Sequence, residues 1–487
     1  MKSITIVGSG TAGLCSAIYL KQMFPQFNIT IVSSSNVGII GVGEGSTEHW
    51  KDFQTFCEID VLEMIRETRA THKYGIRFEN WTNHTPDYFH SVSAEGRLFK
   101  GSFIASYVYA LQNDLLLTDI FSSQGLRLNK IENSENPHLN TNQYHFDTFK
   151  LNEYFTNLCI KRGIKMIDGE VEAIELDAEN GFIESIALKD GSKVSSDFFI
   201  DASGFRRVLM SQMGDQRFES FADYLPCDSA IAFPTASDPS GEIRPYTRAI
   251  ALKYGWMWEI PTQDRRGNGY VYSSRYCSED QAIAEASEVH GFDVVPAKSI
   301  KFNAGYYRKT WQKNCVAVGL ASSFVEPLEA TSIGSTLQQI KLLCSYLPTF
   351  SPASSKTVSE YHRVMDSVMD NILAMVSLHY ISDRNDSDMW RGQADRTVPD
   401  LLGHLLDIWA ERAPEFHDVP STGFELFGVN HFWHVAQGQG VLNFNNASKQ
   451  MEAHSARDTV EMYLMRSQGM RQQAELIDHA KSFTLLQ

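Results

Sequence analysis

Residues 3–13, SITIVGSGTAG, join a β-branched apolar run to a G-x-G-x-x-G turn, and the residues to about Phe24 carry the apolar face of a helix. A second apolar run, Ile29 to Val32, follows, so the segments predict a strand, turn, helix and strand in βαβ order. In such a unit the backbone amides of the turn approach a pyrophosphate at the helix N-terminus, where the helix dipole favours anions. The candidate cofactor contacts of the turn are Gly8, Gly10, Thr11, Ala12 and Gly13.

Ser33 occupies the position, about 20 residues past the last glycine, where a dinucleotide-binding chain usually carries an acid. The acid accepts hydrogen bonds from the ribose hydroxyls of the nucleotide. A serine hydroxyl also accepts a hydrogen bond, although less strongly, so Ser33 is a candidate cofactor contact. The alternative for the whole unit is a glycine turn that closes the βαβ fold and binds no nucleotide.

The composition indicates one large enzyme. The chain has 487 residues, of which 43% are hydrophobic, enough for a substantial core. Its net charge of −16 disfavours nucleic acid and anionic membranes as partners, because both require a basic face. No apolar run approaches the roughly 18 residues of a membrane-spanning helix, and the first residues do not resemble a secretory leader. We therefore expect a cytoplasmic protein.

The cysteines and histidines do not form metal-binding patterns. The seven cysteines are scattered, odd in number and never in C-x-x-C spacing, which indicates reduced thiols. The fifteen histidines include no H-E-x-x-H motif. We predict neither a disulfide framework nor a metal site.

A second glycine-rich stretch, Gly41-Val42-Gly43-Glu44, follows the βαβ unit. Glycines that alternate with small residues suit a backbone packed against a flat or anionic ligand, so these four residues are candidate cofactor contacts. The alternative is a flexible glycine loop. A helical pattern then runs from about His49 to Thr71 and ends just before Lys73. Taken alone, Lys73 is best explained as a solvated lysine.

Residues 82–140 lose regular strand and helix rhythm and gain aromatic residues. We interpret them as a substrate-facing insertion, with Phe103 as a candidate substrate contact. The βαβ pattern resumes in residues 141–205, where Val171 and Asp201 are candidate cofactor contacts. Asp201 ends an apolar strand, and it either meets a cofactor hydroxyl or simply stops the strand.

Residues 206–301 are predicted to form a sheet-rich substrate layer. Trp256 and Trp258 lie two residues apart on a strand, so their side chains point to the same face. They either wall off one side of a ligand or are two large core residues.

The remaining chain contains a second anion-binding turn and a helical part. Residues 302–345 run from a strand through Gly319 to Phe324, Pro327 and a helix start, where amides converge on an anion or a flavin edge. Residues 346–487 begin with apolar side chains at i, i+3, i+4 and i+7, which is typical of a helix that faces a core.

Together these motifs resemble the flavin-dependent tryptophan halogenase family, and the likeness runs nearly end to end. The W-x-W-x-I-P element is the most specific, since the first glycine motif alone occurs in many flavoproteins. The matching elements are Gly8-x-Gly10-x-x-Gly13, Gly41-x-Gly43-Glu44, Thr71-x-Lys73-x-Gly75, Trp256-x-Trp258-x-Ile260-Pro261 and Phe324-x-x-Pro327-Leu328-Glu329-x-x-Ser332-x-Gly334, followed by His379, Arg384, Trp390 and Trp433.

The resemblance implies an α/β fold with FAD-binding G-x-G-x-x-G architecture, of the two-dinucleotide-domain type found in p-hydroxybenzoate hydroxylase. The FAD-binding parts would be residues 1–81, 141–205 and 302–345. A mixed substrate layer and a helical C-terminal part would complete the fold.

The resemblance also implies a reaction. Reduced FAD, oxygen and a halide give hypohalous acid, which passes down a tunnel to an electron-rich aromatic substrate. Lys73 would hold or capture the hypohalous acid, and Glu329 would orient it and stabilise charge during aromatic substitution. The remaining implied roles are cofactor contact by Ile333, halide binding by the amides near Thr331 and Ser332, and separation of substrate from flavin by Trp256, Trp258, Phe324 and Pro327.

Departures from the family pattern shape the expected substrate and partners. Ser332 stands where relatives that use free tryptophan tend to have glycine, and their C-terminal tyrosine-and-tryptophan cluster has no counterpart near Gly438. We therefore expect an indole or phenol rather than free tryptophan, with chloride, bromide or iodide. Without a second nucleotide fingerprint, a single-component halogenase needs a separate NAD(P)H-dependent flavin reductase, and a homodimer is compatible with the sequence.

Two alternatives stay open on the sequence. An FAD-dependent aromatic monooxygenase would transfer oxygen directly and be indifferent to halide. A non-catalytic flavin- or indole-binding protein would carry the same fold with a vestigial site.

Overall fold

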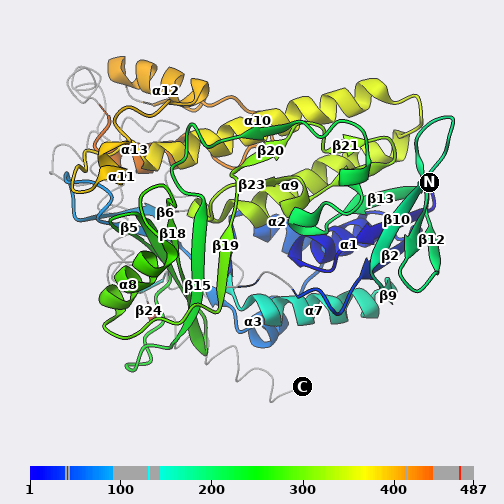
Figure 1. Cartoon of the computed structure of the whole chain (residues 1–487), viewed down its shortest axis with the longest axis horizontal. Coiled ribbons are helices and arrows are strands. Elements are labelled where there is room, and N and C mark those ends of the chain that lie inside the picture. Colours follow the sequence, from blue (N-terminus) through cyan, green and yellow to red (C-terminus); the bar gives the residue numbers. More distant parts are fainter. Residues whose placement is uncertain are drawn as a thin grey trace.

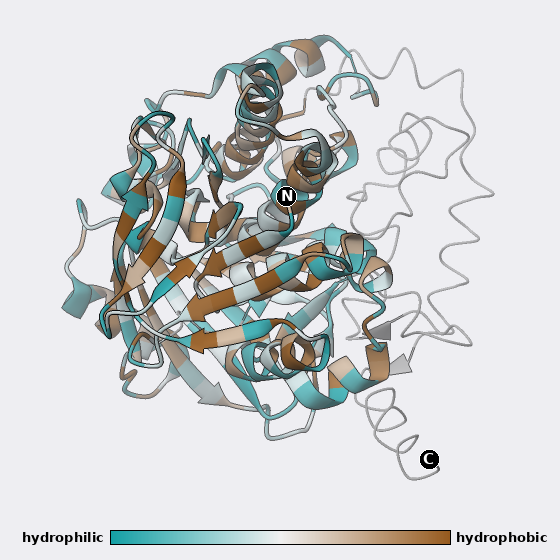
Figure 2. Ribbon diagram, turned by 90° about the vertical axis from the view of Figure 1, so that its right-hand side faces the viewer, coloured by the Kyte–Doolittle hydropathy of each residue, from teal (hydrophilic) through white to brown (hydrophobic). Residues whose placement is uncertain are grey.

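Two β-sheets organise the computed structural model of this chain (Figure 1). The structure describes residues 1–38, 41, 44–91, 130–131, 143–412, 414–442 and 471–472. The six-stranded sheet lies toward the N-terminus on the right of Figure 1, and the seven-stranded sheet lies on the left. Figure 2 shows apolar residues, in brown, concentrated along the strands and the helices that cover them. In the described part of the chain, no helix has both the length and the apolar character needed to cross a membrane.

The six-stranded sheet is built on the predicted βαβ unit, which the structure confirms. Its strand order is β21-β22-β13-β1-β2-β9, with β21 antiparallel to β22 and the other neighbours parallel. Since the carboxyl ends of parallel strands meet at one edge, the loops after β1, β2 and β13 converge there. The elements are β1 (Ser3–Val7), α1 (Thr11–Met23), β2 (Asn28–Ser33), β9 (Lys165–Asp168), β13 (Phe198–Asp201), β21 (Trp311–Gln312) and β22 (Cys315–Ala317).

The seven-stranded sheet has the order β19-β15-β18-β17-β16-β5-β6, and its β16–β5 pair is parallel while the others are antiparallel. Trp258 pairs with Gly269 across β17 and β18, and a Cβ at Gly269 would lie 2.0 Å from the Trp258 ring. Glycine there lets the indole lie flat on the sheet. The strands are β5 (Gly75–Glu79), β6 (Asp87–Ser91), β15 (Ser229–Ala236), β16 (Thr247–Ala251), β17 (Gly255–Pro261), β18 (Arg265–Tyr272) and β19 (Lys298–Lys301).

Smaller sheets complete the described part of the fold. The β3-β8-β4 sheet is antiparallel, and its strand β4 ends at His72, immediately before Lys73. A hairpin around Asp190-Gly191 connects β11 to β12. The strands are β3 (Glu44–Gly45), β4 (Thr71–His72), β7 (Lys130–Ile131), β8 (Tyr144–Phe146), β10 (Val171–Leu176), β11 (Ile183–Leu188), β12 (Lys193–Ser195), β14 (Phe218–Ser220), β20 (Gly305–Tyr307), β23 (Ser323–Phe324) and β24 (Arg471–Gln472).

The single helix expected from His49 to Thr71 is wrong. The structure has two helices, α2 (His49–Phe56) and α3 (Val61–Thr68), separated by a turn. The Asp60 side chain accepts a hydrogen bond of 2.7 Å from the Glu63 amide and thereby caps α3. An N-cap of this kind satisfies an amide that the helix itself cannot bond, so Asp60 starts a new helix.

The other helices cover the six-stranded sheet or form the C-terminal part. Helices α7 and α9 pack on α1. The apolar stripe predicted at the start of residues 346–487 runs from Tyr361 to Val376 and is buried in α10. The helices are α7 (Thr148–Lys161), α8 (Glu279–His290), α9 (Thr331–Tyr346), α10 (Ser355–His379), α11 (Asp388–Arg391), α12 (Asp400–Glu411) and α13 (Val429–Gly438), with 3-10 turns η3 (Gly204–Arg206), η4 (Met210–Gln212), η5 (Gly319–Ala321), η6 (Leu328–Ala330) and η7 (Leu347–Thr349).

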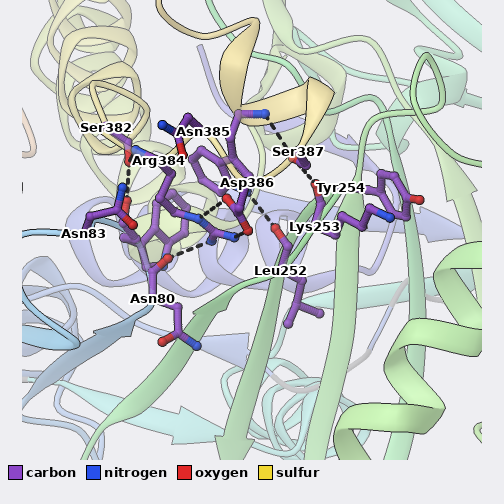
Figure 3. Close-up of polar contacts among 12 residues, drawn as sticks. Asn80, Asn83, Leu252, Lys253, Tyr254, Ser382, Arg384, Asn385, Asp386 and Ser387 are labelled. Carbon is purple, nitrogen blue, oxygen red and sulfur yellow. Dashed lines mark hydrogen bonds and ion pairs between the residues drawn. The ribbon is translucent and has the colours of Figure 1, made fainter.

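A polar clamp fastens the loop after α10 to turns of the seven-stranded sheet (Figure 3). Arg384 donates to the Asn80 carbonyl at 2.7 Å and to both carboxylate oxygens of Asp386, and its guanidinium lies 4.5 Å from the centre of the Trp390 ring. The Ser387 hydroxyl donates to the Lys253 carbonyl at 2.7 Å. The clamp fixes the C-terminal end of α10, where His379 lies.

Arg384→Ala should lower the free energy of unfolding by about 1–3 kcal/mol, because it removes charge-assisted hydrogen bonds and a stacked guanidinium together. Arg363→Ala is the matched control, since that arginine is 60% exposed and pairs with Glu360 on its own helix. Its loss should stay below about 1 kcal/mol. Urea unfolding of both variants measures the difference, and equal losses would contradict the clamp.

Candidate functional site

A cavity of about 570 Å³ lies between the carboxyl edge of the six-stranded sheet and the seven-stranded sheet. It runs from the glycine turn after β1 to strand β17 and the turn η6. The predicted site residues that line it are Gly8, Gly10, Thr11, Ala12, Ser33, Glu44, Val171, Trp256, Trp258, Gly319, Phe324, Pro327, Glu329, Ser332 and Ile333. Among the described residues, Gly13, Gly41, Lys73, Asp201 and Thr331 do not line it. Val42, Gly43 and Phe103 lie outside the described residues.

The three glycines of the first turn are needed for different reasons. Gly8 has φ +112°, and a Cβ on it would lie 2.3 Å from the Ala202 carbonyl oxygen. A Cβ on Gly13 would lie 2.0 Å from the Gly8 oxygen, so this glycine lets α1 pack against the turn. A Cβ on Gly10 would meet no described atom within 4 Å, and Gly10 lines the cavity. The turn therefore presents bare backbone to the cavity, as a bound dinucleotide requires.

Glu44 offers a further polar contact at this end of the cavity. Burial raises the pKa of its carboxyl to about 7, although a hydrogen bond with Thr11 acts in the opposite direction. In the described structure, its Oε2 atom has no hydrogen-bond partner. A ligand that donates a hydrogen bond would satisfy this oxygen, so the acceptor here fits a nucleotide cofactor.

Asp201 is committed to the protein itself. Its carboxylate accepts hydrogen bonds from the Leu209 and Met210 amides, both at 2.8 Å, and from the Ser203 amide at 3.1 Å. The side chain is buried and does not line the cavity. The geometry favours the second interpretation of this residue, a carboxylate that ends β13 and orders the loop after it.

Lys73 is buried, with 1% of its surface exposed, so its interpretation as a solvated lysine is wrong. Its Nζ donates to the Ser46 carbonyl at 2.8 Å. A Cβ on Gly45 would lie 3.4 Å from this Nζ and 3.6 Å from the Ala330 Cβ, so Lys73 and η6 flank Gly45, which itself lines the cavity. Burial lowers the pKa of Lys73 to about 8, while the charges of Glu329 and Glu48 act to raise it.

Glu329 lies in η6 with left-handed backbone, φ +67°, and is followed by Ala330 at φ +56°. Non-glycine residues with this conformation cost about 1–3 kcal/mol each and cluster at functional sites. Burial alone would raise the pKa of the Glu329 carboxyl, but His90 and His379 hold it well below its ordinary value. A buried carboxylate that stays ionised therefore faces the cavity.

Two histidines hold Glu329: His379, which the sequence places among the family elements without a role, and His90, which no motif marks. His90 Nδ1 lies 2.8 Å from both Glu329 oxygens, and His379 Nε2 lies 2.9 Å from Oε1. Behind them, His90 Nε2 lies 2.9 Å from His431 Nδ1, and His431 Nε2 lies 3.1 Å from Glu48 Oε1. We call Glu329, His90, His431 and Glu48 the histidine chain. It joins η6, β6, α13 and the start of α2.

The aromatic wall and the start of α9 complete the site. Trp256 and Trp258 are buried with ring centres 6.1 Å apart, and Phe324 stacks edge-on against Phe302 at 5.0 Å. In the described part of the chain, no side chain caps helix α9, which begins at Thr331 next to the cavity-lining Ser332. Uncapped amides at a helix N-terminus favour an anion.

Known proteins match this chain along nearly its whole length. The tryptophan halogenase family model matches residues 3–456. The chain belongs to the tryptophan halogenase family. This halogenase is 32% identical over 449 residues to tryptophan 6-halogenase SttH of Streptomyces toxytricini, covering 85% of each chain.

Solved structures of halogenases match the fold of this halogenase. Xcc4156, a flavin-dependent halogenase from Xanthomonas campestris, has a TM-score of 0.85 at 31% identity and covers 98% of each chain. The tryptophan halogenase from Shewanella frigidimarina has a TM-score of 0.90 at 25% identity, covering 99% of this chain and 98% of its own. The predicted family, the α/β flavoprotein fold and the assignment as a flavin-dependent halogenase are thereby confirmed. Membership of the family implies FAD, a partner flavin reductase and an aromatic substrate.

Proposed function

We propose that this halogenase uses reduced FAD, oxygen and a halide to halogenate an electron-rich aromatic molecule such as an indole or a phenol. The observation that carries the proposal is the pairing of a buried lysine of lowered pKa, Lys73, with a buried, ionised Glu329 beside one cavity. That cavity also includes the nucleotide turn and the tryptophan wall.

FAD would be held by the glycine turn, Ser33, Glu44 and Gly319, whose lining of the cavity supports this assignment. When bound and reduced, FAD supplies the electrons with which oxygen and halide form hypohalous acid. The uncapped amides at the start of α9, near Thr331 and Ser332, would bind the halide. A separate NAD(P)H-dependent flavin reductase would deliver the reduced cofactor.

Lys73 would hold hypohalous acid by donating a hydrogen bond, or, as a neutral amine, attack its halogen to form a haloamine with release of water. With its pKa lowered to about 8, both forms are accessible near neutral pH. Glu329 would stabilise the cationic ring formed when the halogen adds to the arene. Trp256 and Trp258 would keep substrate and water from the flavin, so that the reagent reacts in a dry site.

The test is a mass-spectrometric assay with FAD, NADH, an unrelated flavin reductase, bromide and a panel of indoles and phenols that includes free tryptophan. We expect products that gain bromine in place of hydrogen. Products that gain oxygen regardless of bromide would indicate the monooxygenase instead. Turnover of free tryptophan alone would contradict the proposed substrate class.

Gly10→Ala and Gly13→Ala form a matched pair that tests the cofactor turn. Gly10→Ala should leave thermal unfolding of the flavin-free protein within a few degrees, since its Cβ meets no described atom, but should weaken FAD binding at least tenfold. Gly13→Ala should lower the unfolding temperature itself, because its Cβ would lie 2.0 Å from the Gly8 oxygen. Calorimetry and FAD titration measure both. Unchanged FAD affinity in Gly10→Ala would contradict the proposed cofactor site.

A further inference from the structure

The histidine chain contains more hydrogen bonds than two neutral imidazoles can supply. Its three contacts join Glu329 to His90 at 2.8 Å, His90 to His431 at 2.9 Å, and His431 to Glu48 at 3.1 Å. Each contact needs one proton. A neutral imidazole has one donor and one acceptor nitrogen, and an ionised carboxylate only accepts. Three filled contacts between two carboxylates therefore require three protons on the two rings, one more than the neutral pair holds.

The surroundings support one positive charge on the pair. Burial would raise the pKa of Glu48, but the charge of His431 and its hydrogen bond, together with His49, lower that pKa to about 2. The Glu329 carboxyl is likewise held ionised by His90 and His379. A cation shared by two imidazoles is then flanked by two anions inside the protein, where such interactions are strong.

His379 does not share this proton. The Gln439 amide donates to the Tyr88 hydroxyl oxygen at 3.2 Å, so Tyr88 is free to donate its own hydrogen to His379 Nδ1 at 3.1 Å. His379 then donates from Nε2 to Glu329 as a neutral ring, and burial lowers its pKa in agreement. Glu329 therefore receives one neutral and one cationic donor.

Exposure is graded along the histidine chain. The side chains of Glu329 and His90 are 1% and 0% exposed, that of His431 is 5% exposed, and that of Glu48 is 24% exposed. Glu48 also accepts a hydrogen bond from the Gln143 amide at 3.3 Å. Its position makes it the member through which solvent and pH act on the buried end. Among the described residues, the other titratable groups that face the histidine chain are Lys73, His49, Tyr88, His379 and His434.

We propose that His90, His431 and Glu48 are positioning residues that hold Glu329 ionised and correctly oriented by sharing one proton between the two imidazoles. Glu48 lies at the far end from the cavity and sets the pH range over which the shared proton is kept. When that proton is lost, two hydrogen-bond acceptors face each other at one of the three contacts. Either Glu329 then loses a hydrogen-bond donor, or His90 loses the hydrogen bonding that supports it. The inference rests on the proposed role of Glu329.

The first test needs no turnover. In the full-length protein labelled with ¹⁵N-histidine, the wild type should show downfield imidazole N–H signals from hydrogen-bonded His90 and His431. In Glu48→Gln the pH at which these signals vanish should fall by about one unit or more, since a neighbouring carboxylate stabilises an imidazolium by that amount. Asp52→Asn is the control. Asp52 is exposed on α2, the helix that begins after Glu48, and its substitution removes the same charge without touching the histidine chain. An unchanged midpoint in Glu48→Gln would overturn the proposal.

His431→Gln distinguishes the role of the histidine chain from the effect of the Glu48 charge on the pKa of Lys73, because it breaks the histidine chain and keeps that charge. It should remove the shared-proton signals and lower kcat at least tenfold while leaving KM for the aromatic substrate within about twofold. Retention of both the signals and kcat would also overturn the proposal. If the signals shift as expected but no halogenated product forms in any variant or in wild type, the proposed function fails and the shared proton stands.

Discussion

Lys73→Met should reduce the rate of halogenation by roughly 10²–10⁴-fold, the usual range for a positioned proton-transfer or nucleophilic group. Methionine keeps the volume and apolar stem of the lysine but has neither a donor nor a nucleophilic nitrogen. FAD affinity should stay within about threefold, because Lys73 does not line the cavity. Steady-state formation of brominated product, with the reductase in excess, measures the effect.

The pH dependence of stability tests whether the charge of Lys73 is buried at a cost in the folded protein. The pKa of Lys73 is about 8 in the folded protein, against 10.5 for an ordinary lysine, so the unfolded chain binds more protons between these values. The wild type should therefore gain stability relative to Lys73→Met as pH rises from 8 to 10.5, by on the order of 3 kcal/mol. Below pH 8 the difference should be constant. Lys150→Met is the control, since Lys150 is 51% exposed and should show no such slope. A flat difference across this range would contradict the burial cost assigned to Lys73.

The sequence predicts those parts of the fold whose signals are local. The strand, glycine turn and helix of residues 3–23 follow from the alternation of residue types within a single unit, and the structure contains them with the expected bounds. The sequence also carries a signal for the helix break at Cys57 that the interpretation as a single helix passed over, because Asp60 and Glu63 have the spacing of a capping pair. Helical periodicity extended across this pair and hid the signal.

The environment of the site residues depends on distant segments. The backbone of Lys73 pairs with Gln143, and its buried side chain reaches the Ser46 carbonyl, so its burial follows from three strands that no local pattern connects. Family resemblance selected Lys73, whereas residue type alone favoured the surface.

The histidine chain shows the same limit more strongly. His90 lies 239 residues from Glu329 and 341 from His431, although each contact is at most 2.9 Å long. The local signals were a histidine on a strand beside Tyr88 and Phe89, and two histidines three residues apart on one helix. Such patterns occur in ordinary cores as well. Only the packing of β6 against α13 makes them a chain.

Glu329→Gln should lower kcat by roughly 10²–10³-fold, the cost of removing one preorganised electrostatic group that faces developing charge. KM for the aromatic substrate should change little, because the ground-state arene is neutral. Glu329→Asp keeps the charge but retracts it by one methylene, so its activity should lie between those of the wild type and Glu329→Gln. Equal activity of Glu329→Gln and the wild type would remove Glu329 from the reaction.

The same substitution should also reveal how the carboxylate is held. Glutamine has one acceptor oxygen where His90 and His379 together approach both oxygens of Glu329, so its amide nitrogen must face an imidazole donor. The folded protein holds the pKa of Glu329 well below that of the unfolded chain, so the carboxylate stabilises the fold above the unfolded value of about 4.3. Glu329→Gln should therefore be less stable than the wild type at pH 7, and the gap should narrow on acidification below about pH 4. Urea unfolding at both pH values measures the gap. A gap that widened on acidification would mean that Glu329 is protonated in the folded protein, and its proposed electrostatic role would then fail.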